Sequence, residues 1–217
     1  MPKLLALLLL LSAHALHAQS ETTIDLRSRG SLSFFLDGEW SVNTSEFGER
    51  IIVTIEPTGE ENASCTLTIT FPEQDAFPTK AKLKQQVEIA SRQFEELSVE
   101  RKAVARELQT RAGFGFYCNF TDPDLVGKKP QKGNYKTISV GFIRVAANVV
   151  VEMAINADGF RSAPYQQLLG ALEGMEYDPR RRKVSNRAEE SPRFQVQFQA
   201  GPAPRQVVRI LPEGISG

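Results

Sequence analysis

Hydrophobic and polar residues alternate in short runs through the first third of the chain, which is the pattern of half-buried β-strands. The runs cover residues 31–36, 39–42, 51–56 and 65–71, and the last of them alternates Thr with apolar residues. Pro57 ends the third run, and short loops connect all four. Four short strands joined by short loops predict an antiparallel meander.

From residue 79 the apolar residues recur at spacings of three and four, with charged residues between them, which predicts an amphipathic helix. Thr79 stands just before this pattern and is the expected N-cap. A helix with one apolar stripe buries only one side, so we expect it to lie on a face of the sheet. The stripe consists of Leu83, Val87, Ala90, Phe94 and Leu97.

Residues 98–110 fit two structures, and the sequence does not decide between them. Val99, Val104 and Leu108 permit a helix, whereas Ala103, Ala105 and the strand that follows permit a short edge strand.

The β pattern then resumes. We expect strands over residues 114–120, 135–144 and 149–156, with a polar loop over 121–134 and a hairpin turn at 145–148. In the last strand one face is formed by Val149 and every second residue to Ile155, and the other by Val150, Glu152 and Ala154.

A second helix follows this hairpin. Asp158-Gly159 predicts a turn, Ser162 is the expected N-cap, and Pro164 suits a first helical turn. Its apolar stripe consists of Tyr165, Leu168, Leu169, Leu172 and Met175. Together these patterns predict one α+β domain over residues 19–177, in which helices cover a mostly antiparallel sheet.

The first 18 residues have the order of a secretory signal peptide. Lys3 precedes an apolar run, Leu4 to Leu11, which is too short to cross a bilayer of about 30 Å, and small and polar residues follow. We expect cleavage after Ala18, with Ala15 as the alternative. The mature protein is therefore expected to be periplasmic or secreted, without a membrane span.

Removal of this leader changes the chemistry open to the protein. The only two histidines, His14 and His17, lie within it. Mechanisms that use imidazole as a base or as a zinc ligand are then excluded. With 26 basic and 26 acidic residues the chain has no net charge, so we expect no nucleic-acid partner. We predict no catalytic residue, cofactor or metal site.

The composition changes again after Tyr177. Residues 178–217 are predicted to be a linker and a C-terminal tail, because a basic run, Arg180 to Lys183, is followed by polar sequence with few apolar residues. Phe194 to Gln199 alternates strictly and Val207 to Leu211 could form a second strand, but a lone two-stranded hairpin is marginal in water. This tail is expected either to be disordered or to dock on a partner.

Cys65 and Cys118 each lie in a predicted strand. Export would place them where disulfides persist, and two cysteines allow a single pairing. The alternative is two buried, unpaired thiols on separate strands, because the sequence does not give the Cα separation that a bridge requires.

The long polar loop contains the cluster of charged side chains that most suggests a functional site. It contains two carboxylates at positions i and i+2, which suit acid–base or Ca²⁺ chemistry, but the spacing of an EF-hand is missing. A solvated loop is the simplest interpretation, and contact with a protein partner is the next. The cluster consists of Asp122, Asp124, Lys128, Lys129 and Lys132.

The order of the predicted elements over residues 31–177 resembles the PsbP-like α/β/α sandwiches, and residues 114–175 look like uncharacterised families of exported bacterial proteins. The resemblance implies a helix on each side of a mostly antiparallel sheet and a role in binding or assembly. It implies no functional residue. It is carried by Trp40 after Asp37-Gly38, Gly115-Phe116-Tyr117, Thr121-Asp122-Pro123, Gly133-Asn134-Tyr135-Lys136, Gly141 and Leu168-Leu169-Gly170-Ala171-Leu172.

These observations lead to one main hypothesis and two alternatives. The main hypothesis is an exported, non-enzymatic binding or assembly module that contacts another exported protein. The first alternative is a periplasmic carrier of an apolar ligand, suggested by the 13 Phe residues. The second is a carboxylate-dependent hydrolase that uses Asp122. The sequence does not indicate an oligomeric state.

Overall fold

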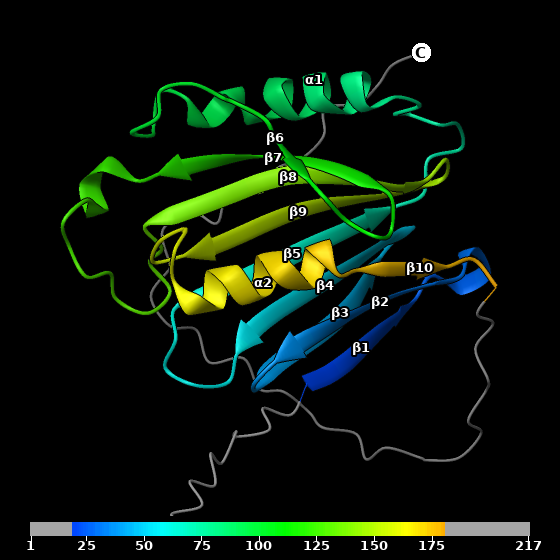
Figure 1. The fold of residues 1–217 in the computed structure, drawn as a ribbon, viewed down its shortest axis with the longest axis horizontal. Coiled ribbons are helices and arrows are strands. Elements are labelled where there is room, and N and C mark those ends of the chain that lie inside the picture. Colours follow the sequence, from blue (N-terminus) through cyan, green and yellow to red (C-terminus); the bar gives the residue numbers. More distant parts are fainter. Residues whose placement is uncertain (1–18, 181–217) are drawn as a thin grey trace, which may run out of the picture. The chain divides into compact units, whose positions relative to one another are not determined.

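The computed structural model describes residues 19–180, which form ten strands, two α-helices and three short 3-10 helices (Figure 1). The predicted leader, residues 1–18, and the tail from residue 181 onward lie outside the described residues. The strands are β1 Gln19–Asp25, β2 Ser31–Asp37, β3 Trp40–Phe47, β4 Arg50–Pro57, β5 Ala63–Thr70, β6 Arg106–Leu108, β7 Phe114–Thr121, β8 Thr137–Ala146, β9 Val149–Ala157 and β10 Glu176–Asp178. The helices are α1 Lys80–Ser91 and α2 Ala163–Glu173, and the 3-10 helices are η1 Arg27–Arg29, η2 Arg92–Phe94 and η3 Pro123–Leu125.

Seven strands form the larger sheet in the order β3-β4-β5-β9-β8-β7-β6, and every neighbouring pair is antiparallel. The predicted α+β class with a mostly antiparallel sheet is therefore confirmed. The meander prediction was wrong in one respect, because β2 does not pair with β3. It pairs instead with β1 and β10 in a separate three-stranded sheet. The turn between β2 and β3 contains Gly38 at φ +93°, a backbone conformation that favours glycine.

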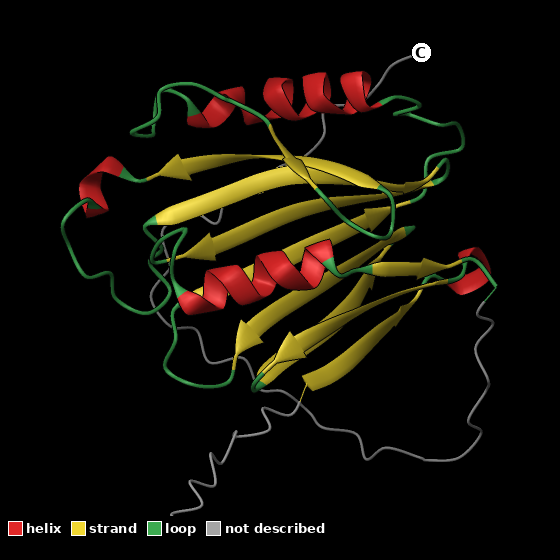
Figure 2. Cartoon of the chain, in the orientation of Figure 1, coloured by secondary structure: helices red, strands yellow, loops and turns green. Residues whose placement is uncertain are grey.

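Separate layers cover the two faces of the larger sheet. Cys65, Leu67 and Ile69 are fully buried in a first core, which α2 and the smaller sheet complete. On the opposite face, α1 packs over β7 and β8 and closes a second core that includes Leu83 and Val87. The two helices thus lie on different faces of the sheet (Figure 2). No helix within residues 19–180 is long and apolar enough to cross a membrane.

Helix α1 begins as predicted but ends early. The Thr79 hydroxyl accepts a hydrogen bond from the Lys82 backbone N–H at 3.3 Å, which confirms the cap. After Ser91 the chain tightens into η2, which changes the angle between successive side chains. Phe94 still stacks on Phe120 with ring centroids 5.2 Å apart, whereas Leu97 leaves the stripe and is 73% exposed.

The structure decides the segment that the sequence left open. β6 is a short edge strand paired with β7, so the edge-strand alternative is confirmed. Ser162 stands at the predicted N-cap position of α2, but its hydroxyl donates to the Gly159 carbonyl at 2.8 Å and does not cap the helix. Past α2, β10 pairs with β2 and extends through Asp178, one residue beyond the predicted end of the domain.

Cys65 and Cys118 are both buried and unpaired, so of the two alternatives the structure shows separate thiols. Cys65 on β5 faces the first core, whereas Cys118 on β7 faces the second. Two strands, β9 and β8, lie between β5 and β7, which corresponds to about 14 Å at the usual strand spacing. A disulfide requires a Cα separation below about 7 Å, so the bridge cannot form in this fold.

We expect a thiol reagent to react with neither cysteine in the native protein, because burial raises the pKa of both thiols, that of Cys65 to about 12. After unfolding without reductant, both cysteines of the chain should react. The measurement is a colorimetric thiol titration with and without denaturant. Unreduced, unfolded protein that shows no reactive thiol would contradict this arrangement.

Candidate functional site

The predicted partner-contact loop connects β7 to β8, and a hydrogen bond holds its two ends together. The Asp122 backbone N–H donates to the Lys136 carbonyl at 2.8 Å, which closes the loop at its base. The Asp122 carboxylate accepts the backbone N–H of Asp124 at 2.8 Å and caps η3. The two carboxylates that suggested acid–base chemistry therefore belong to a turn, and Asp122 is occupied in shaping it.

Asn62, the residue before β5, holds the far part of this loop. Its amide nitrogen donates to the Asp158 carboxylate at 2.6 Å and to the Asn134 carbonyl at 3.1 Å, while its amide oxygen accepts from the Gly133 N–H at 2.8 Å. One side chain thus ties three separate segments together. Sequence reasoning missed Asn62, because an asparagine after Gly59-Glu60-Glu61 is typical of any turn.

The three loop lysines have different environments. The Lys132 ammonium donates to the Gly59 carbonyl at 2.7 Å and so helps to hold the loop against the β4–β5 connection. Lys128 and Lys129 are exposed, and their side chains have no partner among residues 19–180. Of the three loop lysines, Lys128 and Lys129 are therefore the two whose ammonium groups are free to meet an external molecule.

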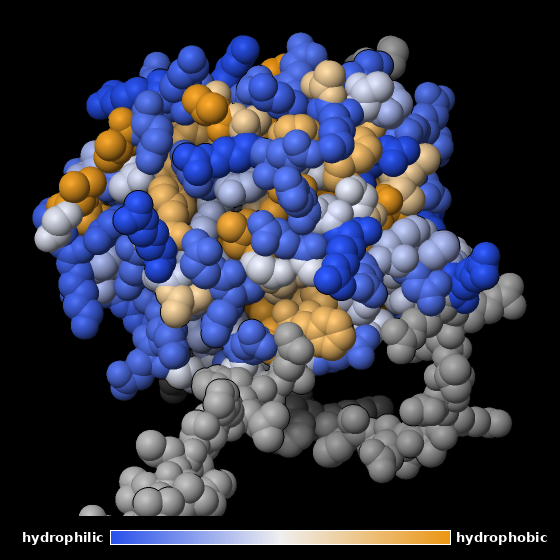
Figure 3. Space-filling model, in the orientation of Figure 1, coloured by the Kyte–Doolittle hydropathy of each residue, from blue (hydrophilic) through white to orange (hydrophobic). Residues whose placement is uncertain are grey.

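Large apolar side chains are exposed beside the same loop, at the end of β7. Leu97 is 73%, Val99 52% and Val126 56% exposed. Figure 3 shows hydrophobic side chains along this border of the molecule, over the segment after α1 and over η3. We call Leu97, Val99, Val126, Lys128 and Lys129 the β7-end surface.

The segment that carries Leu97 and Val99 is also held in place. The Val99 N–H donates to the Thr121 carbonyl at 2.9 Å. The Glu100 carboxylate accepts from both the N–H and the hydroxyl of Thr121, each at 2.7 Å. This segment is thus anchored to the last residue of β7, while the β7–β8 loop is held by the Asp122–Lys136 hydrogen bond and by Asn62. A surface built in this way loses little conformational entropy when it binds a partner.

Groups with shifted pKa values lie mainly in the cores and do not gather at a surface site. Burial raises the pKa of Tyr165 to about 12, and its hydroxyl is hydrogen-bonded to the Ser139 hydroxyl at 2.8 Å. Ser139 in turn donates to the Asn119 amide oxygen at 2.6 Å. This network fixes α2 on the sheet and leaves Ser139 buried, which does not suit a nucleophile.

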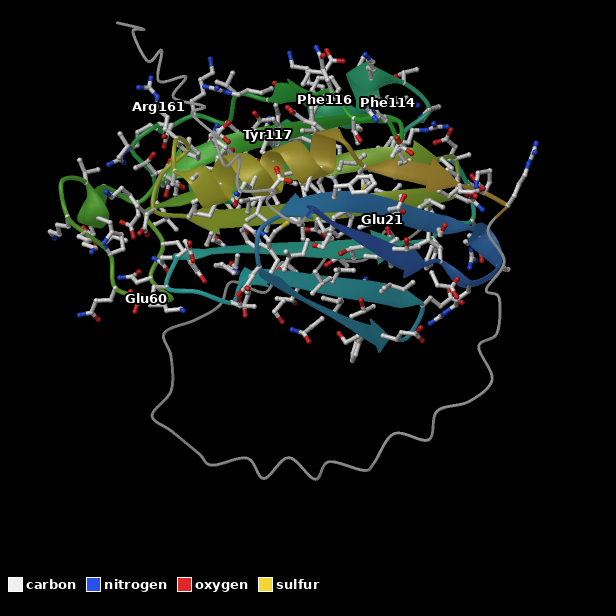
Figure 4. The ribbon with its side chains drawn as sticks, turned by 60° about the horizontal axis from the view of Figure 1, so that its bottom comes forward. Glu21, Glu60, Phe114, Phe116, Tyr117 and Arg161 are labelled. Carbon is white, nitrogen blue, oxygen red and sulfur yellow. The ribbon has the colours of Figure 1, made fainter. Side chains whose placement is uncertain are left out.

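Charged residues elsewhere on the described part of the chain form separate ion pairs, of which Arg144 with Asp75, at 2.6 Å, is the least exposed. Glu21, Glu60 and Arg161 stand well apart in Figure 4, on β1, on the β4–β5 loop and before α2. Within residues 19–180, no group of three or more His, Cys, Asp or Glu side chains is placed to hold a metal ion.

A groove of about 530 Å³ runs along α2. Its lining is partly apolar, at Phe35 and Ala171, and partly charged, at Asp37 and Arg111. Arg111 is also paired with Glu176 at 3.0 Å. The groove is the feature of the structure that bears on the carrier hypothesis, although its charged groups would remain beside an apolar ligand.

We expect Asn62→Ala to loosen the β7–β8 loop while the sheet stays folded. The substitution removes the side-chain hydrogen bonds at Asp158, Asn134 and Gly133, and water replaces them, so a loss of about 1–2 kcal/mol in unfolding free energy is expected. Amide hydrogen exchange at Gly133 should accelerate strongly. Asn43→Ala on β3 is the control, and equal exchange at Gly133 in both variants would show that Asn62 does not hold the loop.

The chain matches no model of a known protein family, and no curated protein matches it either.

Proposed function

We propose that this protein is an exported, non-enzymatic binding module that docks another exported protein through the β7-end surface. The observation that carries the proposal is the exposure of Leu97, Val99 and Val126 together on anchored loops. Exposed apolar side chains that are grouped and rimmed by polar residues are typical of interaction sites, whereas single ones are not. The predicted loop contributes Val126 and the two free lysines.

The composition of the surface indicates the chemistry of its partner. Burial of one Leu or Val side chain contributes roughly 1.5–3 kcal/mol before the cost of association is subtracted. Lys128 and Lys129 lie beside the apolar centre and favour a partner with carboxylates at its rim. We therefore expect an apolar anchor surrounded by acidic residues, bound with moderate affinity.

Export is the second part of the proposal and rests on the leader pattern of residues 1–18. β1 begins at Gln19, so cleavage after Ala18 or after Ala15 leaves the whole strand in the mature protein. Intact-mass measurement of protein recovered from the periplasm or the medium should give a chain that begins at Gln19 or Leu16. A mass that still includes Met1 would contradict export by this route.

The similarity to PsbP-like sandwiches remains part of the proposal. In support, α1 and α2 lie on different faces of an antiparallel sheet, as that pattern requires. The three-stranded sheet of β1, β2 and β10 is an addition that the resemblance did not include.

The docking surface can be tested by affinity purification of the exported protein. The double variant Leu97→Asp/Val126→Asp should lose a co-purifying exported protein that the wild type retains, because two carboxylates would enter the apolar centre of the interface. Phe35→Asp is the matched control, since Phe35 is also an exposed apolar residue but lines the groove along α2. Equal recovery with the double variant and the wild type would reject the surface.

The carrier hypothesis remains the second candidate because of the groove along α2. Native mass spectrometry of purified protein would support it by detecting a bound lipid that Phe35→Asp loses. Protein without ligand in both forms would count against it. The hydrolase hypothesis has less support, because the Asp122 carboxylate caps η3; it would require an activity that Asp122→Asn abolishes.

A further inference from the structure

β10 is the last element of the described fold, and the chain is exposed directly after it (Figure 1). β10 pairs with β2 through Asp178, and the Tyr177 hydroxyl donates to the Arg29 carbonyl at 2.7 Å. Pro179 and Arg180 are exposed. Within residues 19–180, both hydrophobic cores are formed by side chains that precede Asp178. We therefore expect the domain to fold without the residues that follow β10.

Four consecutive basic residues, Arg180 to Lys183, begin at this point and are called the basic run. Endopeptidases that select consecutive basic residues hold each side chain in a pocket with a carboxylate, as trypsin does for a single one. They bind several residues before the cleaved bond as an extended strand, so these residues must not pair with a strand of their own protein. Cleavage concentrates in exposed chain outside packed elements. The basic run begins in such a place.

The carboxylates nearest to the basic run are already engaged. Glu176 pairs with Arg111 at 3.0 Å, and the Asp178 carboxylate accepts the backbone N–H of Arg180 at 2.8 Å. The Arg180 guanidinium has no partner among residues 19–180. It is therefore available to a carboxylate of another protein.

Lys128-Lys129 is also an exposed pair of adjacent basic residues, but the fold holds it. The Lys128 N–H donates to the Leu125 carbonyl at 3.1 Å, and Asn62 holds the far part of the same loop. Pro130 follows the pair and has no N–H to offer to an enzyme that binds an extended backbone. The loop must open locally before this pair can be cleaved, which slows cleavage.

Arg101-Lys102 is the third place in the chain where basic residues are adjacent, and both of its neighbours are anchored. The Glu100 carboxylate accepts two hydrogen bonds from the last residue of β7, each at 2.7 Å. The Ala103 N–H donates to the Glu95 carboxylate at 2.7 Å, and Ala103 is buried. The basic run therefore differs from both other pairs, because it follows the last packed element.

We propose that the basic run is a processing site for an endopeptidase with acidic pockets for successive basic residues. Water adds across one peptide bond, which leaves a carboxylate on the basic residue and an amino group on the next residue. β10 restricts the choice of bond, because Tyr177 and Asp178 pair with β2 and do not extend into the enzyme. The bond after Lys183 lets the whole run occupy the enzyme's pockets. The products are a domain that ends at Lys183 and a segment that begins at Val184.

Intact-mass analysis of the protein recovered from its native cells tests this proposal. The wild type should be recovered as a chain that ends at Lys183. The quadruple variant Arg180→Gln/Arg181→Gln/Arg182→Gln/Lys183→Gln should keep the chain through Gly217, because it offers no basic side chain to the acidic pockets. Arg101→Gln/Lys102→Gln is the matched control and should be processed like the wild type.

Digestion of the purified full chain with an endopeptidase selective for consecutive basic residues gives the second readout. Cleavage within the basic run should be at least about tenfold faster than cleavage at residues 101–102 or 128–129, because those two pairs require local opening. The chain carries both competing pairs, so each digestion contains its own comparison.

Three results would overturn the proposal. They are a wild-type chain that still ends at Gly217 in its native cells, a quadruple variant processed at the same place, and equal cleavage at the basic run and at either other pair. Export matters only as the step that brings the chain to the enzyme. A product that ends at Lys183 but keeps Met1 would support processing and contradict export, and none of the variants alters the β7-end surface.

Discussion

Gly141→Ala is expected to destabilise the protein by about 3 kcal/mol or more, which lowers the melting temperature by roughly 6–12 °C for a domain of this size. A Cβ added at Gly141 would lie 2.2 Å from the Phe116 carbonyl oxygen and 2.7 Å from the Tyr117 Cβ. Two of these three residues, Gly141 and Tyr117, face each other in the pairing of β8 with β7. The added methyl group can be accommodated only if the two strands move apart.

Thermal and denaturant unfolding measure this effect, and the chain offers a matched control. Gly170 lies within α2, and a Cβ added there meets nothing within 4 Å. Gly170→Ala should therefore stabilise the protein by up to about 1 kcal/mol, since alanine has the higher helix propensity. If Gly141→Ala melted at the wild-type temperature, the close approach of β7 and β8 would be wrong.

Tyr165→Ala is expected to cost about 3–5 kcal/mol, because it removes a large aromatic side chain from the first core. The Tyr165 ring packs edge-on against Phe160 with centroids 5.5 Å apart, and its hydroxyl bonds to Ser139. The loss should appear as a lower unfolding midpoint in denaturant, with faster hydrogen exchange throughout α2. Full protection of α2 in this variant would contradict the packing described.

Tyr165→Phe isolates the hydroxyl group and gives a dependence on pH. Burial raises the pKa of Tyr165 to about 12, above the ordinary value of 10, so the folded state holds the proton more tightly than the unfolded state. Its contribution to stability is therefore complete below pH 10 and is lost as the pH rises from 10 through 12. Cys65 acts in the same direction in both proteins, so the difference between them reports Tyr165.

We expect the stability of Tyr165→Phe to fall less steeply than that of the wild type between pH 10 and 12. Near pH 8 the variant should be only about 1 kcal/mol less stable, which is the usual net contribution of one hydrogen bond. The measurement is urea unfolding at several pH values. Parallel curves for the two proteins would mean that Tyr165 ionises as readily in the folded state as in the unfolded state.

The sequence predicted most strands and both helices because their signals are local. The alternation around Leu67 and the spacing of Leu83 and Val87 reflect burial of one face, which any long apolar pattern reveals. β1 and β10 were missed for the opposite reason. Each is short or polar, and each exists because it pairs with β2, which is a contact between distant parts of the chain.

The candidate site was predicted only in part, for related reasons. A long polar loop is visible in the sequence, and Lys128 and Lys129 are indeed exposed. Leu97 was assigned to the apolar stripe of the helix, because periodicity does not show that α1 ends at Ser91. Asn62 and Glu100 hold the site through hydrogen bonds to distant residues, and a single sequence carries no signal for such contacts.

Photo-crosslinking in cells that export the protein tests the central claim most directly, with a benzophenone side chain placed at position 126 or, separately, at position 54. The β7-end surface predicts a specific adduct with another exported protein from position 126. It predicts none from position 54, which lies on β4. An adduct from position 54 alone, or none from either position, would contradict docking through this surface.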